Sequence, residues 1–149
     1  MGVKLKHGIN KTLIQNKSLI LIDDSLVRGT TSVKIIKMLY EFGAKEVHLR
    51  IASPPIKYPD YYGVDTPSKQ ELLASKLDLE GMRKFINATT LQFLSIDGLY
   101  KSMGCNKRNS SYPQYTDHCF TGDYPIKPVD ADDEDLKKVK SHIFKKINS

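Results

Sequence analysis

The chain contains no tryptophan, only two cysteines, and no aliphatic run longer than the one from Leu19 to Ile22. A membrane-spanning helix needs about 20 apolar residues, so no transmembrane segment is predicted. The stretch from Met1 to Lys6 also lacks the apolar region of a signal peptide. Cys105 and Cys119 form no C-x-x-C pair, which predicts neither a disulfide nor a zinc site. These absences favour a cytoplasmic globular protein with no membrane partner.

Acidic residues are missing from the first 22 positions, which carry four of the chain's 23 lysines and arginines. A basic start of this kind favours a polyanionic ligand, although scattered lysines that solvate a surface would give the same pattern. No basic patch is interleaved with aromatic residues, so nucleic acid is not expected as a partner. The histidines are scattered and receive no role: His7, His48, His118 and His142.

The stretch from Ser18 to Ser32 organises the chain, and it opens with the aliphatic run Leu19–Ile22. Its aliphatic start predicts a strand that is buried on both faces of a parallel sheet. Apolar residues then recur at helical spacing, which predicts a helix from Thr31 to about Phe42 that ends at Gly43. Ligands of open α/β sheets bind beyond the carboxyl ends of the strands, so the loop between the two elements is the candidate site.

The residue types of this loop suit a phosphorylated sugar. Gly29 permits a tight turn, and the hydroxyl and backbone N–H groups of residues 30–32 favour an anion at the start of the helix. The adjacent carboxylates of Asp23 and Asp24 can accept hydrogen bonds from sugar hydroxyls or hold Mg²⁺. Two other interpretations remain open. A single acid after a strand is commonly a turn or helix cap, and paired acids also end a strand in receiver domains.

Four further segments accompany this loop in the same order as in one enzyme family. The stretch from Ile22 to Ser32 resembles the phosphoribosyl-pyrophosphate signature of type I phosphoribosyltransferases, and in its wording that of the glutamine phosphoribosylpyrophosphate amidotransferases. The other segments that resemble this family are Ala52–Ile56, Tyr62–Pro67, Glu71–Ser75 and Cys119–Pro125. The resemblance extends from Gly2 to about Pro125.

This resemblance implies a partial type I phosphoribosyltransferase fold: an α/β structure with a mainly parallel sheet, flanking helices and a C-terminal helical tail. The family is a glycosyltransferase of purine biosynthesis, in which ammonia displaces pyrophosphate from phosphoribosyl pyrophosphate to give phosphoribosylamine. Mg²⁺ is the implied cofactor, held with the help of Asp23 and Asp24, and no catalytic side chain is required. The implied substrate-binding residues are Asp23, Asp24, Ser25, Val27, Arg28, Gly29, Thr30, Thr31 and Ser32.

The remaining pattern continues the alternation of strands and helices. Ser53–Pro67 is predicted to be an irregular loop with several prolines and tyrosines, which borders the active site in the family. A capping box of Ser68 and Glu71 opens the next helix. Other expected elements are strands at Lys11–Gln15, Glu46–Ala52 and Leu91–Leu94, a helix at Asp78–Ile86, and a helix at Ile96–Met103 capped by Ser95 or Asp97.

We expect three parts: a partial phosphoribosyltransferase domain over residues 1–104, an irregular extension over 105–131, and a C-terminal helix over 132–149. The last part has acids at its start, lysines at its end and an apolar stripe between Asp132 and Lys146. Such a stripe indicates a helix that docks on its own domain or on a partner.

The chain departs from the family in three respects. It has no amino-terminal cysteine and no glutaminase domain, and it begins where the family's flexible lid ends, so half of the active site is expected to be missing. Some relatives carry an iron–sulfur cluster. Asp60 stands where they have a cysteine, and Pro113–Cys119 retains only Cys119 of their C-x-x-C-x-x-C run, so no iron–sulfur cluster is predicted.

A missing half would leave the apolar edge at Leu19–Ile22 uncovered, and an upstream fragment or a second copy would have to pair with it. Three hypotheses follow. The chain is the carboxyl-terminal half of an amidophosphoribosyltransferase and is inactive alone, or it is a non-enzymatic sensor of phosphoribosyl ligands, or it is a decayed remnant.

Overall fold

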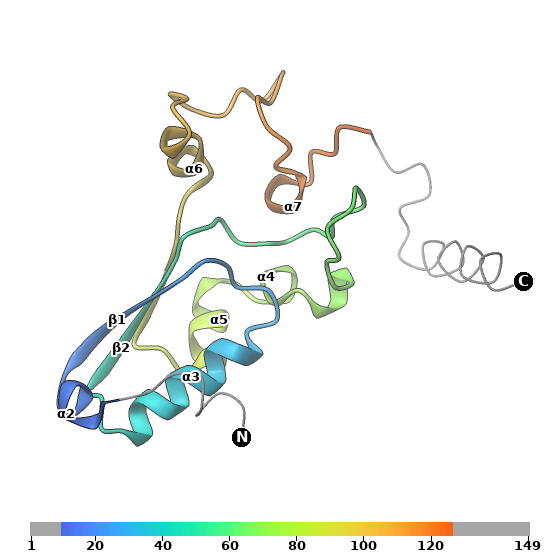
Figure 1. Cartoon of the computed structure of the whole chain (residues 1–149). Helices are drawn as coiled ribbons and strands as arrows, with labels where there is room; N and C mark the ends of the chain where they lie inside the picture. Colours follow the sequence, from blue (N-terminus) through green and yellow to red (C-terminus); the bar gives the residue numbers. More distant parts are fainter. Residues whose placement is uncertain (1–9, 127–149) are drawn as a thin grey trace, which may run out of the picture.

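The computed structural model describes residues 10–126, and its centre is a three-stranded parallel sheet (Figure 1). The strands β1 (Ser18–Asp23), β2 (Glu46–Ile51) and β3 (Thr90–Phe93) lie in the order β1-β2-β3. Leu21 pairs with Leu49, which pairs in turn with Leu91. The predicted α/β class with a parallel sheet is confirmed, because the helical chain after β1 and after β2 returns to the same end of the sheet before the next strand begins.

Two helices cover one face of this sheet: α3 (Thr30–Glu41) and α5 (Leu79–Ile86) (Figure 1). The alternation in β2 turns Val47, Leu49 and Ile51 toward them, and all three side chains are buried. Ile36 and Ile86 are fully buried on the facing helices. Burial of apolar side chains between one sheet face and two helices therefore forms the core.

On the other face of the sheet, β1 is exposed, although the sequence predicted burial there. Leu19 and Leu21 pack against the core, whereas Ile20 and Ile22 are 69% and 72% exposed. The prediction of a strand buried on both faces is wrong for the described residues. The physical reason is that α3 and α5 cover a single face, and among residues 10–126 no element covers the other face or pairs with the outer edge of β1.

Residues Lys11–Gln15 do not form the predicted strand. They form the single helical turn α2 (Lys11–Ile14), whose first residues are capped by the side chain of Asn10, which accepts a hydrogen bond from the Thr12 amide. A strand at this position would need a hydrogen-bonded neighbour, whereas one helical turn satisfies its own backbone. The predicted turn into β1 is present, and Asn16 adopts a positive φ of 60° there.

Short elements connect the main ones. The capping box of Ser68 and Glu71 is confirmed, but it opens only the 3-10 turn η1 (Lys69–Glu71), which is followed by α4 (Leu73–Lys76). Ser95 rather than Asp97 caps α6 (Ile96–Ser102). No described helix has the length and hydropathy needed to cross a membrane.

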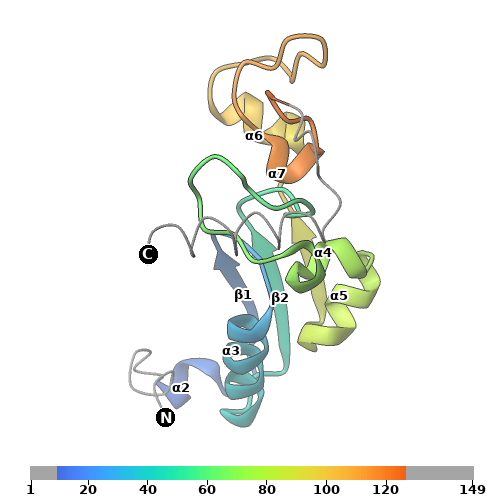
Figure 2. The same cartoon turned by 90° about the vertical axis from the view of Figure 1, so that its right-hand side faces the viewer.

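The chain beyond Gly104 contains one short helix among its described residues, α7 (His118–Thr121), which the sequence pattern did not predict. Figure 2 shows α6 and α7 beyond the carboxyl ends of the strands, at the end of the sheet opposite α2. The division near residue 104 stays a prediction. The helix expected at Asp132–Lys146 lies outside the described residues.

Candidate functional site

The loop after β1 is anchored to the buried core and to α4. Leu26 is only 2% exposed, and the Val27 carbonyl accepts a hydrogen bond of 2.8 Å from the backbone N–H of Leu73 in α4. One buried side chain and one backbone contact thus hold the middle of the loop on α4, while its polar residues turn outward. The loop is therefore an ordered part of the fold.

Gly29 makes the turn from this loop into α3. It has a φ of 76°, in the left-handed region, and a Cβ at this position would lie 2.9 Å from Leu73 Cδ2. Only glycine meets both conditions without strain. No side chain caps α3, so the backbone N–H groups of its first turn, at residues 30–32, have no intrahelical partner. This is the arrangement that binds anions at helix N-termini.

Asp23 and Asp24 lie at the carboxyl end of β1. Asp23 Oδ1 accepts a hydrogen bond from the Asp24 amide, and Asp24 Oδ1 accepts one of 2.6 Å from the Ser25 amide. Within residues 10–126 the second oxygen of each carboxylate accepts no hydrogen bond, so both carboxylates can still accept a ligand. The pair fits Mg²⁺, which is usually held by one or two carboxylates together with water and substrate phosphates. The described residues contain no group of three or more His, Cys, Asp or Glu that could hold a metal alone.

Arg28 forms an ion pair with Glu71 at 3.0 Å, and both side chains are about half exposed. The Ser68 hydroxyl, which donates to Glu71, and then the Arg28 guanidinium lower the pKa of the Glu71 carboxyl from its usual value. An exposed pair of this kind contributes little stability. Its main effect is to direct Arg28 toward the segment that begins at Ser68.

All nine substrate-binding residues expected from the sequence line one pocket of about 590 Å³. Together with Leu26, these nine residues form one side of the pocket, residues 23–32, which we call the loop wall. The opposite side, called here the proline wall, comes from the irregular segment after β2. Its residues are Ile56, Val64, Asp65, Thr66 and Pro67.

A buried hydrogen bond lies behind the proline wall. His118 Nε2 donates to Asp60 Oδ2 at 2.6 Å, and His118 is 4% exposed. Burial alone would raise the pKa of the Asp60 carboxyl, but the backbone N–H groups of Tyr62 and Val64 and the imidazole of His118 together lower it. No sequence signal joined these two residues, which are 58 positions apart. Asp60 is also the position at which cluster-bearing relatives were expected to have a cysteine.

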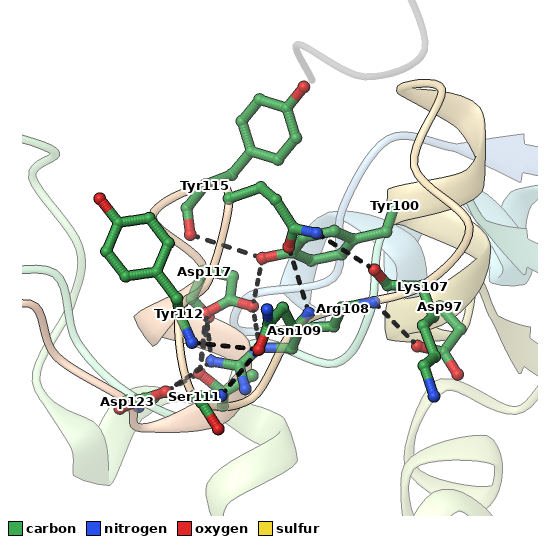
Figure 3. Close-up of polar contacts among 12 residues, drawn as sticks. Asp97, Tyr100, Lys107, Arg108, Asn109, Ser111, Tyr112, Tyr115, Asp117 and Asp123 are labelled. Atoms are coloured by element: carbon green, nitrogen blue, oxygen red, sulfur yellow. Dashed lines mark hydrogen bonds and ion pairs between the residues drawn. The ribbon is translucent and has the colours of Figure 1, made fainter.

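A second buried pair ties α7 to α6 (Figure 3). The guanidinium of Arg108 donates to both oxygens of Asp117, and the Tyr100 hydroxyl donates to Asp117 Oδ2 at 2.9 Å. Burial raises the pKa of Asp117, yet the hydrogen bonds from Arg108 and Tyr100 outweigh it and hold that pKa below the usual value. Arg108 also pairs with Asp123 at 2.7 Å.

Known proteins match this combination of loop and sheet. The amidophosphoribosyltransferase of Rhizobium etli is 54% identical over 136 residues, which are 91% of this chain and 27% of the relative. The chain is similar to one segment of the amidophosphoribosyltransferases. The Bacillus subtilis amidophosphoribosyltransferase is 46% identical over 124 residues, 83% of this chain and 26% of that protein. The chain thus spans about a quarter of the length of the curated relatives it matches.

Solved amidophosphoribosyltransferase structures show the same fold. The glutamine phosphoribosylpyrophosphate amidotransferase of B. subtilis, complexed with ADP and GMP, matches with a TM-score of 0.69 and 42% identity over 84% of this chain and 29% of its own. A structure described as the allosteric regulatory enzyme of purine biosynthesis matches with a TM-score of 0.65 and 38% identity, over 84% of this chain and 28% of its own. No family model matches the chain. The resemblance expected from the sequence is confirmed.

Proposed function

We propose that this chain binds phosphoribosyl pyrophosphate and Mg²⁺ in the pocket after β1, and that it supplies this part of an amidophosphoribosyltransferase active site. The observation that carries the proposal is the meeting of two opposite binding elements in one pocket. Two adjacent carboxylates lie at one end of the loop wall, and an uncapped helix start lies at the other. A sugar that carries hydroxyls and phosphates needs both.

In this proposal the backbone N–H groups of residues 30–32 donate to the 5-phosphate. The dipole of α3 stabilises the bound phosphate by about 0.3–1 kcal/mol. Asp23 and Asp24 accept hydrogen bonds from the ribose hydroxyls. The left-handed turn at Gly29 brings the backbone close enough to donate. Each residue therefore binds or orients the sugar, and none needs to form a covalent bond to it.

Displacement of pyrophosphate passes through an oxocarbenium-like state, in which positioning of the sugar lowers the barrier. Bound Mg²⁺ would neutralise charge on the departing pyrophosphate. The relatives are more than three times as long as this chain. We therefore propose that the complete reaction requires further protein, either another segment or a second copy, and the exposure of Ile20 and Ile22 supports a neighbour from outside residues 10–126.

The decisive experiment is calorimetric titration of the chain with phosphoribosyl pyrophosphate and Mg²⁺. We expect saturable binding that is lost when Asp23→Asn and Asp24→Asn are combined. Glu80→Gln is the matched control, because it removes a carboxylate that lies on α5 and does not line the pocket. A folded wild-type chain that binds no phosphoribosyl pyrophosphate would reject the proposal and would favour a remnant.

A sensor of purine nucleotides is the second candidate. It is favoured by the B. subtilis relative that was solved with ADP and GMP, since both ligands contain a ribose 5-phosphate. The same loop wall would then bind the nucleotide. Titration with GMP separates the two functions: tight GMP binding with no pyrophosphate release, even when a complementing fragment is added, would support the sensor.

A further inference from the structure

The proline wall lacks regular structure. Between Ile51 and Lys69 the chain forms neither helix nor strand, so no ladder of backbone hydrogen bonds holds this wall in place. The wall nevertheless supplies five residues to the pocket. Some other interaction must therefore define its distance from the loop wall.

Asp60 makes that interaction. Its carboxylate Oδ1 accepts hydrogen bonds from the backbone N–H groups of Tyr62, at 2.7 Å, and Val64, at 3.1 Å. Its own backbone N–H donates to Thr66 Oγ1 at 2.6 Å. Val64 and Thr66 both line the pocket. One acidic residue thus organises the turn that presents the proline wall.

His118 holds Asp60 from outside the wall. Its Nε2 donates to the second carboxylate oxygen, Oδ2, and its ring packs against the rings of Tyr62 and Tyr124 at centroid distances of 5.1 and 5.0 Å. The Cys119 carbonyl next to it accepts hydrogen bonds from the backbone N–H groups of Lys57 and Tyr58. The start of α7 is therefore bound to the same irregular segment by both side chain and backbone.

The residue next to His118 is also fixed in place by buried polar contacts. Asp117, the neighbour of His118, binds Arg108 and the Tyr100 hydroxyl of α6 (Figure 3). Two consecutive residues thus make buried polar contacts in different directions: Asp117 toward Arg108 and α6, and His118 toward the proline wall. No residue of 105–126 lines the pocket, yet this segment connects the wall to the sheet.

We propose that Asp60 and His118 are positioning residues that set the place of the proline wall, so that the segment after α6 shapes the ligand pocket without touching the ligand. This inference rests on the proposed function, because the pocket is taken to bind a phosphoribosyl ligand. Asp60 and His118 together are called the clamp. Loss of the clamp releases Val64 and Thr66 and leaves the loop wall intact.

The test compares His118→Phe, which removes the donor, with His118→Gln, whose side-chain N–H reaches the same carboxylate. Hydrogen exchange of residues 60–67 reports the wall, and calorimetry reports binding of phosphoribosyl pyrophosphate with Mg²⁺ and, separately, of inorganic phosphate. We expect His118→Phe to speed exchange at Val64 and to weaken phosphoribosyl pyrophosphate binding about tenfold, as expected for loss of a hydrogen bond to a charged group. Inorganic phosphate needs only the loop wall, so its binding stays unchanged, and His118→Gln restores both values.

The outcomes separate the two proposals. Faster exchange without weaker phosphoribosyl pyrophosphate binding overturns the positioning role, and unchanged exchange overturns the clamp itself. Equal weakening for inorganic phosphate, or no recovery in His118→Gln, means that the substitution merely damages the fold and overturns the positioning role as well. If the wild-type chain binds no phosphoribosyl pyrophosphate, the proposed function fails, and exchange at Val64 alone decides whether the clamp holds the wall.

Discussion

Residues 18–93 and residues 105–126 are held together by different forces. The first region buries aliphatic side chains between one sheet face and two helices, and its largest contacts involve no charge. The second region has one short helix and no strand among its described residues, and its buried polar contacts centre on Asp117 and His118. Apolar burial tolerates small changes of geometry, whereas a buried charge depends on one partner in one place. The proline wall lies within residues 18–93, but its Asp60 depends on His118 of the second region, so the wall shares the lower tolerance of that region.

The largest expected effect follows from removing one partner of a buried pair. Arg108→Ala leaves the Asp117 carboxylate, which is 3% exposed, without its cation. Removing one partner of a buried pair costs about 3–5 kcal/mol, and the loss should fall on the segment after α6. Hydrogen exchange by segment is the appropriate measurement. We expect exchange to rise across residues 105–126 while α3 and β2 stay protected.

Leu49→Ala is the comparison for that experiment, because Leu49 is fully buried in the apolar core. Its cost of about 2–5 kcal/mol should appear in every segment as a lower global stability. If Arg108→Ala also exposed the sheet uniformly, the two regions would form a single cooperative unit and the contrast between them would be wrong.

Gly29→Ala should have the next largest effect, and it should act on both stability and binding. The left-handed φ costs any other residue about 1–2 kcal/mol, and the added methyl group would lie 2.9 Å from Leu73. Urea unfolding measures the first effect, and titration with phosphoribosyl pyrophosphate measures the second. Gly104→Ala is the control, since Gly104 also has a positive φ, of 84°, but has no atom within 4 Å of the place that a methyl group would take and does not line the pocket. Comparable loss of binding in both variants would remove the special role of the turn at Gly29.

The sequence predicted the region held by apolar contacts far better than the other. Strand β2 and helix α3 were expected because their periodicity is local, and Gly43 and Ser95 gave the helix ends. The loop wall was likewise predictable, because its residues are consecutive. These features could be predicted because the residues that produce them lie close together in the sequence.

Long-range contacts explain what was missed. The exposure of Ile20 and Ile22 depends on whether anything covers the second sheet face, which no property of β1 itself can reveal. The clamp joins positions 58 apart, and neither Asp60 nor His118 lies in a recognisable motif. Strand propensity at Lys11–Gln15 failed because a strand also needs a neighbour.

Lowering the pH should destabilise residues 105–126 and the proline wall before the apolar core, and its effect should be smaller than that of the substitutions above. The pKa values of Asp60 and Asp117 are lowered by folding, so the folded chain holds these carboxylates charged where the unfolded chain begins to protonate. Their contribution is fully present above the ordinary pKa of 3.8 and is lost as the pH falls below it toward the lower folded values. Exchange measured from pH 6 downward should therefore rise first in residues 105–126 and at the proline wall. Asp60→Asn should flatten this dependence at the wall, and an equally early loss in β2 would contradict the assignment.

The smallest expected effect concerns the exposed face of the sheet, on which Ile20 and Ile22 lie. Ile20→Thr keeps the β-branched shape that suits a strand but removes apolar surface, and because Ile20 is 69% exposed the stability should change by no more than about 0.5 kcal/mol. Leu21→Thr, on the opposite face of the same strand, packs against the core and should cost clearly more. Urea unfolding at two protein concentrations is the measurement. A large cost for Ile20→Thr that grows with concentration would mean that a second copy covers this face in solution, and the sheet would then have two buried faces after all.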